Sequence, residues 1–135
     1  MPRAKRLESA TQTYHWIARG INERKLFSMK KDFDYFQKLL HEYKDRFHLK
    51  IYHYCLMGNH AHLLLYAPQL SSLSHFAYYV QRRYAHYQHQ LYNWKGQVFR
   101  RSFTSIPVEN DVYLLECGRY IERNPLRAQM VGKIE

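Results

Sequence analysis

The sequence is poor in cysteine, glycine, proline and acidic residues, and these shortages narrow the classes of protein it can belong to. Cys55 and Cys117 are its two cysteines and lie far apart, so neither a disulfide scaffold nor a zinc ribbon is indicated. The four prolines and five glycines are scattered, which favours one domain over residues 1–135. No apolar run reaches the roughly 18 residues that a membrane-spanning helix needs. The polar, basic residues 1–12 do not resemble a secretory signal, so we expect a cytoplasmic protein.

Positive charge is abundant where negative charge is scarce. Lysine and arginine outnumber aspartate and glutamate by 21 to 11, which gives a net charge of +10 and favours a polyanionic partner such as nucleic acid. An acidic membrane surface remains possible on this count. The 13 tyrosines, 7 phenylalanines and 2 tryptophans would suit stacking on unpaired bases. An aromatic core under a solvated basic surface would explain the same composition.

The spacing of apolar residues predicts an alternation of strands and helices. Runs rich in β-branched and aromatic residues, bounded by turn residues, predict strands over 13–20, 50–57, 60–67 and 97–108. Apolar steps of three and four predict helices over 30–48, 71–92 and 110–124, with Ser28 as a cap of the first. The order β-α-β-β-α-β-α predicts an α+β fold, in which a small antiparallel sheet has helices on one face and a second, free face.

Two histidines one residue apart stand within the segment CLMGNHAHLLLY. Side chains alternate along a strand, so His60 and His62 should share one face while Ala61 and Leu63 point to the helices. Side by side, the two imidazoles could bind one cation. Any two alternating histidines on an exposed strand look the same, so a metal site requires a third ligand.

The last predicted helix offers that ligand together with a nucleophile. Tyr120 and Asn124 are four residues apart and share a helical face. An amide oxygen suits Mg²⁺ or Mn²⁺, and a phenol beside a metal-bound phosphate is a candidate nucleophile. Ordinary packing and helix termination before proline would explain the same two residues. Tyr84 and Gln88 repeat the spacing, but Tyr84 falls in the apolar stripe of its helix and is predicted to lie in the core.

Four stretches of the chain, in order, resemble a known family. His60 and His62 within YCLMGNHAHLLL, and the later RYIERNPLRA, resemble the HUH single-strand transposases, and most closely the REP-associated tyrosine transposases. RGINERKLF and KGQVFRRSF resemble them as well. The resemblance implies a ferredoxin-like sandwich and a metal-assisted breakage of DNA by tyrosine. His60, His62 and Asn124 match the metal ligands of that family, and Tyr120 matches its nucleophile.

The function expected from residues and resemblance together is a DNA transposase acting on single-stranded or hairpin DNA. It would cleave and rejoin DNA through a 5′-phosphotyrosine intermediate with Mg²⁺ or Mn²⁺ as cofactor, and would be associated with the nucleoid when bound to DNA. A homodimer remains open, as does the question of whether Tyr120 acts within one chain or across two. The backbone of the DNA is expected to contact six arginines: Arg82, Arg83, Arg100, Arg101, Arg119 and Arg123.

Two other classes of function fit the same residues. A nucleic-acid-binding module without catalysis would use the basic and aromatic surface and would be indifferent to the replacement of Tyr120 by phenylalanine. A metal-dependent nuclease would use water as its nucleophile and would release both DNA ends without a covalent protein adduct. Both alternatives remain open on the sequence.

Overall fold

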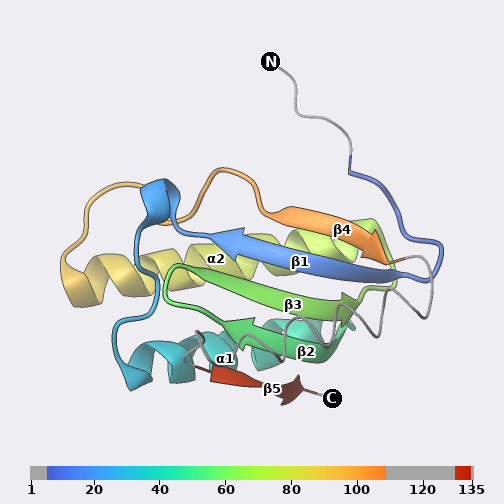
Figure 1. Ribbon diagram of the computed structural model, residues 1–135, viewed down its shortest axis with the longest axis horizontal. Helices are drawn as coiled ribbons and strands as arrows, with labels where there is room; N and C mark the ends of the chain where they lie inside the picture. Colours follow the sequence, from blue (N-terminus) through green and yellow to red (C-terminus); the bar gives the residue numbers. More distant parts are fainter. Residues whose placement is uncertain (1–5, 109–129, 135) are drawn as a thin grey trace.

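The computed structural model describes residues 6–108 and the backbone of residues 130–134 (Figure 1). Eight elements follow one another in these residues: β1 (Thr13–Arg19), a 3-10 turn η1 (Ile21–Glu23), α1 (Lys30–Arg46), β2 (Lys50–Leu56), β3 (His60–Tyr66), α2 (Leu70–Tyr92), β4 (Thr104–Val108) and β5 (Met130–Ile134). The first two helices and the first three strands therefore lie where apolar periodicity predicts them, to within two residues.

The strands form one sheet in the order β4-β1-β3-β2-β5, and every neighbouring pair is antiparallel. α1 connects β1 to β2 and α2 connects β3 to β4, and both helices cover the same face of the sheet (Figure 1). This arrangement is the ferredoxin-like α+β sandwich that was expected. The core lies between the sheet and the helices, where Ala61, Leu63 and Leu65 of β3 are buried against side chains such as Phe36 and Phe76.

The prediction of a strand over residues 97–108 is wrong for residues 97–103. Only Thr104–Val108 form β4, and ahead of it a single bridge joins Phe99 to Gly20. β1 pairs Ile17 with Thr104, so two residues on β1 (18 and 19) face four on the other segment (100 to 103). The four residues do not fit the ladder, and the chain bulges away from β1 between the two pairs.

Three further details differ from the prediction. Ser28 is not the cap of α1: the helix begins after Met29, and the Asp32 carboxylate accepts the backbone N–H groups of Ser28 (2.8 Å) and Met29 (3.0 Å). Leu91, at the end of the predicted apolar stripe of α2, is exposed in the last turn of the helix. β5 was not predicted at all. The helix expected over 110–124 lies outside the described residues.

The turns at one end of the sheet hold the first residues of β3 in place. β2 and β3 form the expected hairpin around Gly58 and Asn59, and the Gly58 carbonyl accepts the N–H groups of Leu26 (2.7 Å) and Phe27 (3.1 Å). The Gly20 N–H donates to the Asn59 carbonyl at 2.9 Å. At Gly20 the chain turns so tightly that a Cβ atom would lie 2.1 Å from the carbonyl oxygen of Arg24. A glycine is therefore required beside the hairpin.

Candidate functional site

The paired histidines stand together at the start of β3, on the face of the sheet away from the helices. The ring centroids of His60 and His62 are 4.6 Å apart, with the rings nearly perpendicular. His60 is half-buried, and its Nδ1 lies 2.7 Å from the side-chain oxygen of Asn59. His60 also lines a small cavity of about 190 Å³, together with Arg19, Arg100 and the acidic Glu23.

A third histidine, which sequence reasoning gave no role, belongs to this cluster. His15 of β1 pairs with Leu64 and lies diagonally across from His62, and its Nε2 is 3.0 Å from His62 Nδ1. One ring must donate this hydrogen bond and the other accept it, so the contact couples the tautomers of the two rings and orients His62 by its Nδ1 atom. His15 belongs to the site because β1 pairs with β3, which brings together positions 47 residues apart. One sequence does not show which strands pair, so it could not reveal this role of His15.

All three imidazoles are held in their neutral form at neutral pH. Burial, and then the nearby Arg19, lower the pKa of His15 to about 4. Burial, and then the proximity of His15, His60 and Arg19, lower the pKa of His62 to about 3. The pKa of His60 is lowered by the same burial and by Arg19. A neutral imidazole has a lone pair for a metal ion, whereas an imidazolium does not.

The face that holds the histidines is less open than the sequence suggested. His62 is only 4% exposed, and Leu64 and Cys55 are also buried. Cross-strand neighbours contribute to the burial of His62, because Ile17 of β1 and Cys55 of β2 lie on either side of it. His60, at the end of the strand, is the more accessible of the pair. Replacing His62 is therefore expected to cost stability, which the prediction of two exposed histidines did not foresee.

The described residues supply two of the ligands that a metal site would need. Two neutral imidazoles lie on one strand, and His15 holds the Nδ1 side of His62. Within residues 6–108, no group of three or more His, Cys, Asp or Glu side chains is arranged to hold a metal ion. The described residues of these four types therefore supply no third ligand beside His60 and His62. Asn124, the predicted third ligand, lies outside the described residues together with Tyr120, Arg119 and Arg123.

The rival tyrosine proves to be a core residue. Tyr84 is completely buried, and its hydroxyl donates to the Leu26 carbonyl at 2.6 Å. The Gln88 amide donates to the same carbonyl at 2.9 Å and to the Tyr84 hydroxyl at 3.2 Å. Burial, and then the charge of Asp32, raise the pKa of Tyr84 far above its ordinary value. The prediction that Tyr84 packs in the core is confirmed.

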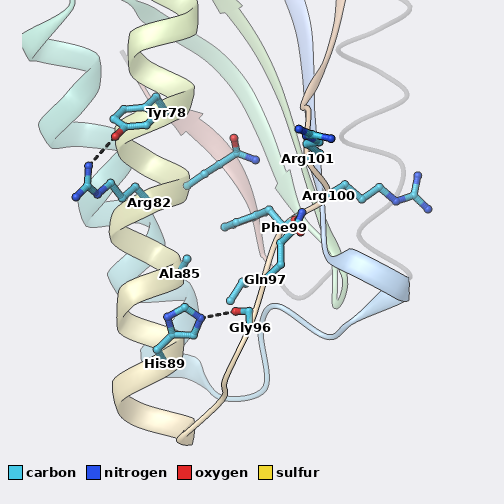
Figure 2. Close-up of a pocket in the computed structure, with 11 residues that line it drawn as sticks. Tyr78, Arg82, Ala85, His89, Gly96, Gln97, Phe99, Arg100 and Arg101 are labelled. Atoms are coloured by element: carbon cyan, nitrogen blue, oxygen red, sulfur yellow. Dashed lines mark hydrogen bonds between the residues drawn. The ribbon is translucent and has the colours of Figure 1, made fainter. Parts of the chain in front are cut away.

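Three of the four described arginines expected to bind DNA lie around one surface groove. Arg82 comes from α2, whereas Arg100 and Arg101 come from the bulged segment before β4, and all three line the groove between them (Figure 2). Arg83 is turned away from them, because its guanidinium donates to the Tyr43 hydroxyl of α1 at 2.8 Å. The bulge that interrupts the ladder at residues 100 to 103 thus places two arginines at the groove.

Comparison with known proteins identifies the family of the chain. The sequence profile described as "Transposase IS200 like" matches residues 8–124, which is most of the sequence. This chain belongs to the IS200-like transposase family. A search of curated proteins finds no match to this IS200-like transposase.

Solved structures share the fold of this IS200-like transposase. The structure of a REP-associated tyrosine transposase bound to a REP hairpin superposes with a TM-score of 0.76 at 15% sequence identity, covering 93% of this chain and 73% of the other. A Deinococcus radiodurans R1 protein assigned as a transposase superposes with a TM-score of 0.56 at 20% identity, covering 90% and 97% of the two chains. Within the described part of our transposase, no helix is long and apolar enough to cross a membrane.

Proposed function

We propose that this IS200-like transposase cleaves and rejoins single-stranded or hairpin DNA, with Tyr120 as its nucleophile. His60, His62 and Asn124 would hold a divalent cation, Mg²⁺ or Mn²⁺. The observation that carries the proposal is the pair of imidazoles on β3, whose ring centroids are 4.6 Å apart and whose pKa values are lowered so that both rings are neutral. His15 and Asn59 each hold one of these rings by its Nδ1 atom, which supports the proposal further.

The reaction is a phosphodiester transesterification. The phenolic oxygen of Tyr120 attacks phosphorus, the bond from phosphorus to the 3′ oxygen breaks, and a 5′-phosphotyrosine and a free 3′-hydroxyl result. The phenol loses one proton and the leaving oxygen gains one. A tyrosine with a pKa near ~10 is mostly protonated at neutral pH, so its proton must leave during the attack. The reaction exchanges one phosphodiester for another of similar energy. A 3′-hydroxyl can therefore attack the phosphotyrosine, reverse the step and join DNA without ATP.

The cation, when bound, would offset the negative charge on the phosphate oxygens and orient the scissile bond. The protein's own residues prepare that site before any ligand arrives. His15 orients the ring of His62, and Asn59 orients the ring of His60, each through the Nδ1 atom of that ring. Arg19, beside His60 in the register of β1 and β3, adds a positive charge where the phosphate would lie.

Structural similarity to another protein favours hairpin DNA as the substrate. The REP-associated tyrosine transposase that superposes with a TM-score of 0.76 is bound to a REP hairpin. The net charge of +10 and the arginines around the site suit a polyanion. Unpaired DNA near the cleaved bond suits the site, since a flexible backbone can bend to present one phosphate to the tyrosine.

The experiment is incubation of the purified protein with end-labelled hairpin DNA, drawn as a pool from the DNA that flanks its gene, with Mg²⁺ or Mn²⁺. A denaturing gel and mass mapping then detect a protein–DNA adduct. We expect an adduct on Tyr120 that requires the metal. Cleavage without any adduct would replace the proposal with a nuclease that uses water, and binding without cleavage would replace it with a binding module.

A further inference from the structure

A basic groove runs between α2 and the segment that returns from it (Figure 2). After α2 ends at Tyr92, Asn93 (φ 52°) and Gly96 (φ 103°) adopt left-handed backbone conformations and turn the chain back along the helix. His89 Nε2 and the Gly96 carbonyl oxygen are 2.6 Å apart and join the two walls at one end. The cavity measures about 610 Å³, within the usual range for ligand sites.

The lining of the groove combines positive charge with flat and amide side chains. Arg82, Arg100 and Arg101 line it, and none of the described residues that form its walls is acidic. Tyr78 is 51% exposed, and its hydroxyl accepts a hydrogen bond of 2.6 Å from the Arg82 guanidinium. Gln97 lies on the opposite wall, where its amide donates to the Phe99 carbonyl at 2.7 Å and so holds the returning segment in shape. An exposed tyrosine beside arginines is what an unpaired, charged nucleotide would contact.

The groove connects with the histidine site through one residue. Arg100 lines both the groove and the small cavity at His60. The Arg100 N–H donates to the Arg19 carbonyl at 2.8 Å, and Arg19 pairs with His60 across the ladder. Adjacent strands lie about 4.8 Å apart, so the backbones of His60 and Arg100 are about 10 Å apart. A strand of nucleic acid at His60 therefore reaches the groove over Arg19 and Arg100.

We propose that this groove binds the unpaired DNA next to the phosphate that lies at the histidine site. Arg82 and Arg101 contact the phosphates of that strand, and Tyr78 stacks on one of its bases. A single strand suits the groove better than a duplex, because bases must enter a concave space beside the exposed Tyr78 ring. This inference rests on the proposed function only for the position of the phosphate at His60.

The test compares two double variants that remove the same charge from the full-length protein. Arg82→Ala/Arg101→Ala removes two exposed arginines of the groove, and Lys31→Ala/Lys38→Ala removes two exposed lysines of α1 as the control. The probe is oligothymidine that carries one photoreactive iododeoxyuridine. Fluorescence anisotropy over a range of salt concentrations gives affinity, and mass mapping after irradiation gives the residues in contact with the base. Thermal unfolding verifies that each variant is folded.

We expect the arginine variant to bind oligothymidine about tenfold more weakly at low salt. The slope of log affinity against log salt should become shallower by about 0.7 for each phosphate that the variant no longer neutralises. The lysine control should stay within about twofold of the wild type, and the crosslink should map to the peptide that contains Tyr78 and disappear in Tyr78→Ala. Equal affinities for the two double variants, or a crosslink that maps away from the groove, would overturn the inference. The Tyr120 adduct is measured separately, so either proposal can fail while the other stands.

Discussion

His15 Nε2 lies 3.0 Å from His62 Nδ1, in a hydrogen bond that joins β1 to β3 on the face away from the helices. The bond leaves His62 with its Nε2 atom as the one that can face a cation, provided that Nδ1 carries the proton and donates it to His15. A residue 47 positions away in the sequence thus orients one of the two proposed ligands.

Replacing His15 by phenylalanine should weaken metal binding. The phenylalanine ring keeps much of the volume of the buried imidazole but cannot accept the proton of His62 Nδ1, so the tautomer and ring orientation of His62 are no longer fixed. Loss of such an outer partner typically lowers metal affinity about 10–100-fold. Titration with Mn²⁺, followed by electron paramagnetic resonance or calorimetry, measures the change without any DNA.

The matched control for that titration is His86→Gln, which removes an exposed histidine on α2. It should bind Mn²⁺ as the wild type does. If His15→Phe is folded and also binds Mn²⁺ like the wild type, His15 does not position His62 for a metal.

Asp32 is expected to make the protein sensitive to acid. Burial raises its pKa, but hydrogen bonds from the N–H of Ser28, from Tyr92 and Tyr87, and from the N–H of Met29 outweigh burial and hold the pKa below its ordinary 3.8. A folded-state pKa below the unfolded one stabilises the fold at neutral pH, and this contribution is lost as the pH falls from about 3.8 toward the folded value.

Asp32→Asn should therefore lower the free energy of unfolding at neutral pH by about 2 kcal/mol or more, since hydrogen bonds to a charged group are worth about 1.5–3 kcal/mol each. The loss should shrink in strong acid. Asp34→Asn is the control, because its exposed ion pair with Lys30 is worth at most about 0.5 kcal/mol. Urea unfolding across a pH series measures both. Equal losses in the two variants would contradict the role given to Asp32.

Two glycines beside the histidine site should respond differently to alanine. At Gly20 a Cβ atom would meet the backbone of Arg24 at 2.1 Å, whereas at Gly58 its nearest contact is the Lys25 Cε atom at 4.0 Å. We expect Gly20→Ala to lower the free energy of unfolding by about 1–3 kcal/mol and Gly58→Ala to change it little. Denaturant unfolding of both variants measures the difference, and a Gly20→Ala protein as stable as Gly58→Ala would show that the turn can relax.

Tyr84→Phe tests whether the buried tyrosine is structural. The variant leaves the Leu26 carbonyl with the Gln88 amide as its remaining side-chain donor. We expect the free energy of unfolding to fall by about 1 kcal/mol, with DNA cleavage retained. Thermal unfolding and the gel assay measure the two effects. A stable Tyr84→Phe protein that no longer cleaves DNA would reverse the roles of Tyr84 and Tyr120.

Local patterns in the sequence predicted the elements that depend on local periodicity. α1 and α2 follow from apolar steps of three and four, and β3 follows from the alternation around His60 and His62. The core positions Ala61 and Leu63 follow from the same alternation. These features are set by side chains that are neighbours in the sequence, which is why one sequence suffices for them.

The features that depend on pairing between distant segments could not be predicted in the same way. His15 meets His62 only because β1 lies beside β3, and the burial of His62 depends on the strands on both sides of it. The residues before Thr104 look strand-like, but their register with β1 leaves four residues opposite two. β5 has five residues and pairs with β2, which lies about 75 positions earlier in the sequence, so its place in the sheet depends on a distant segment.

The most direct test of the central claim is the covalent adduct itself. Wild-type protein and Tyr120→Phe are incubated with end-labelled hairpin DNA and Mn²⁺, with Tyr84→Phe as the matched tyrosine control, and the adduct is quantified on a denaturing gel. We expect the wild type and Tyr84→Phe to form an adduct that EDTA abolishes, and Tyr120→Phe to form none. Undiminished cleavage by folded Tyr120→Phe would contradict the account, because the nucleophile would then not be Tyr120.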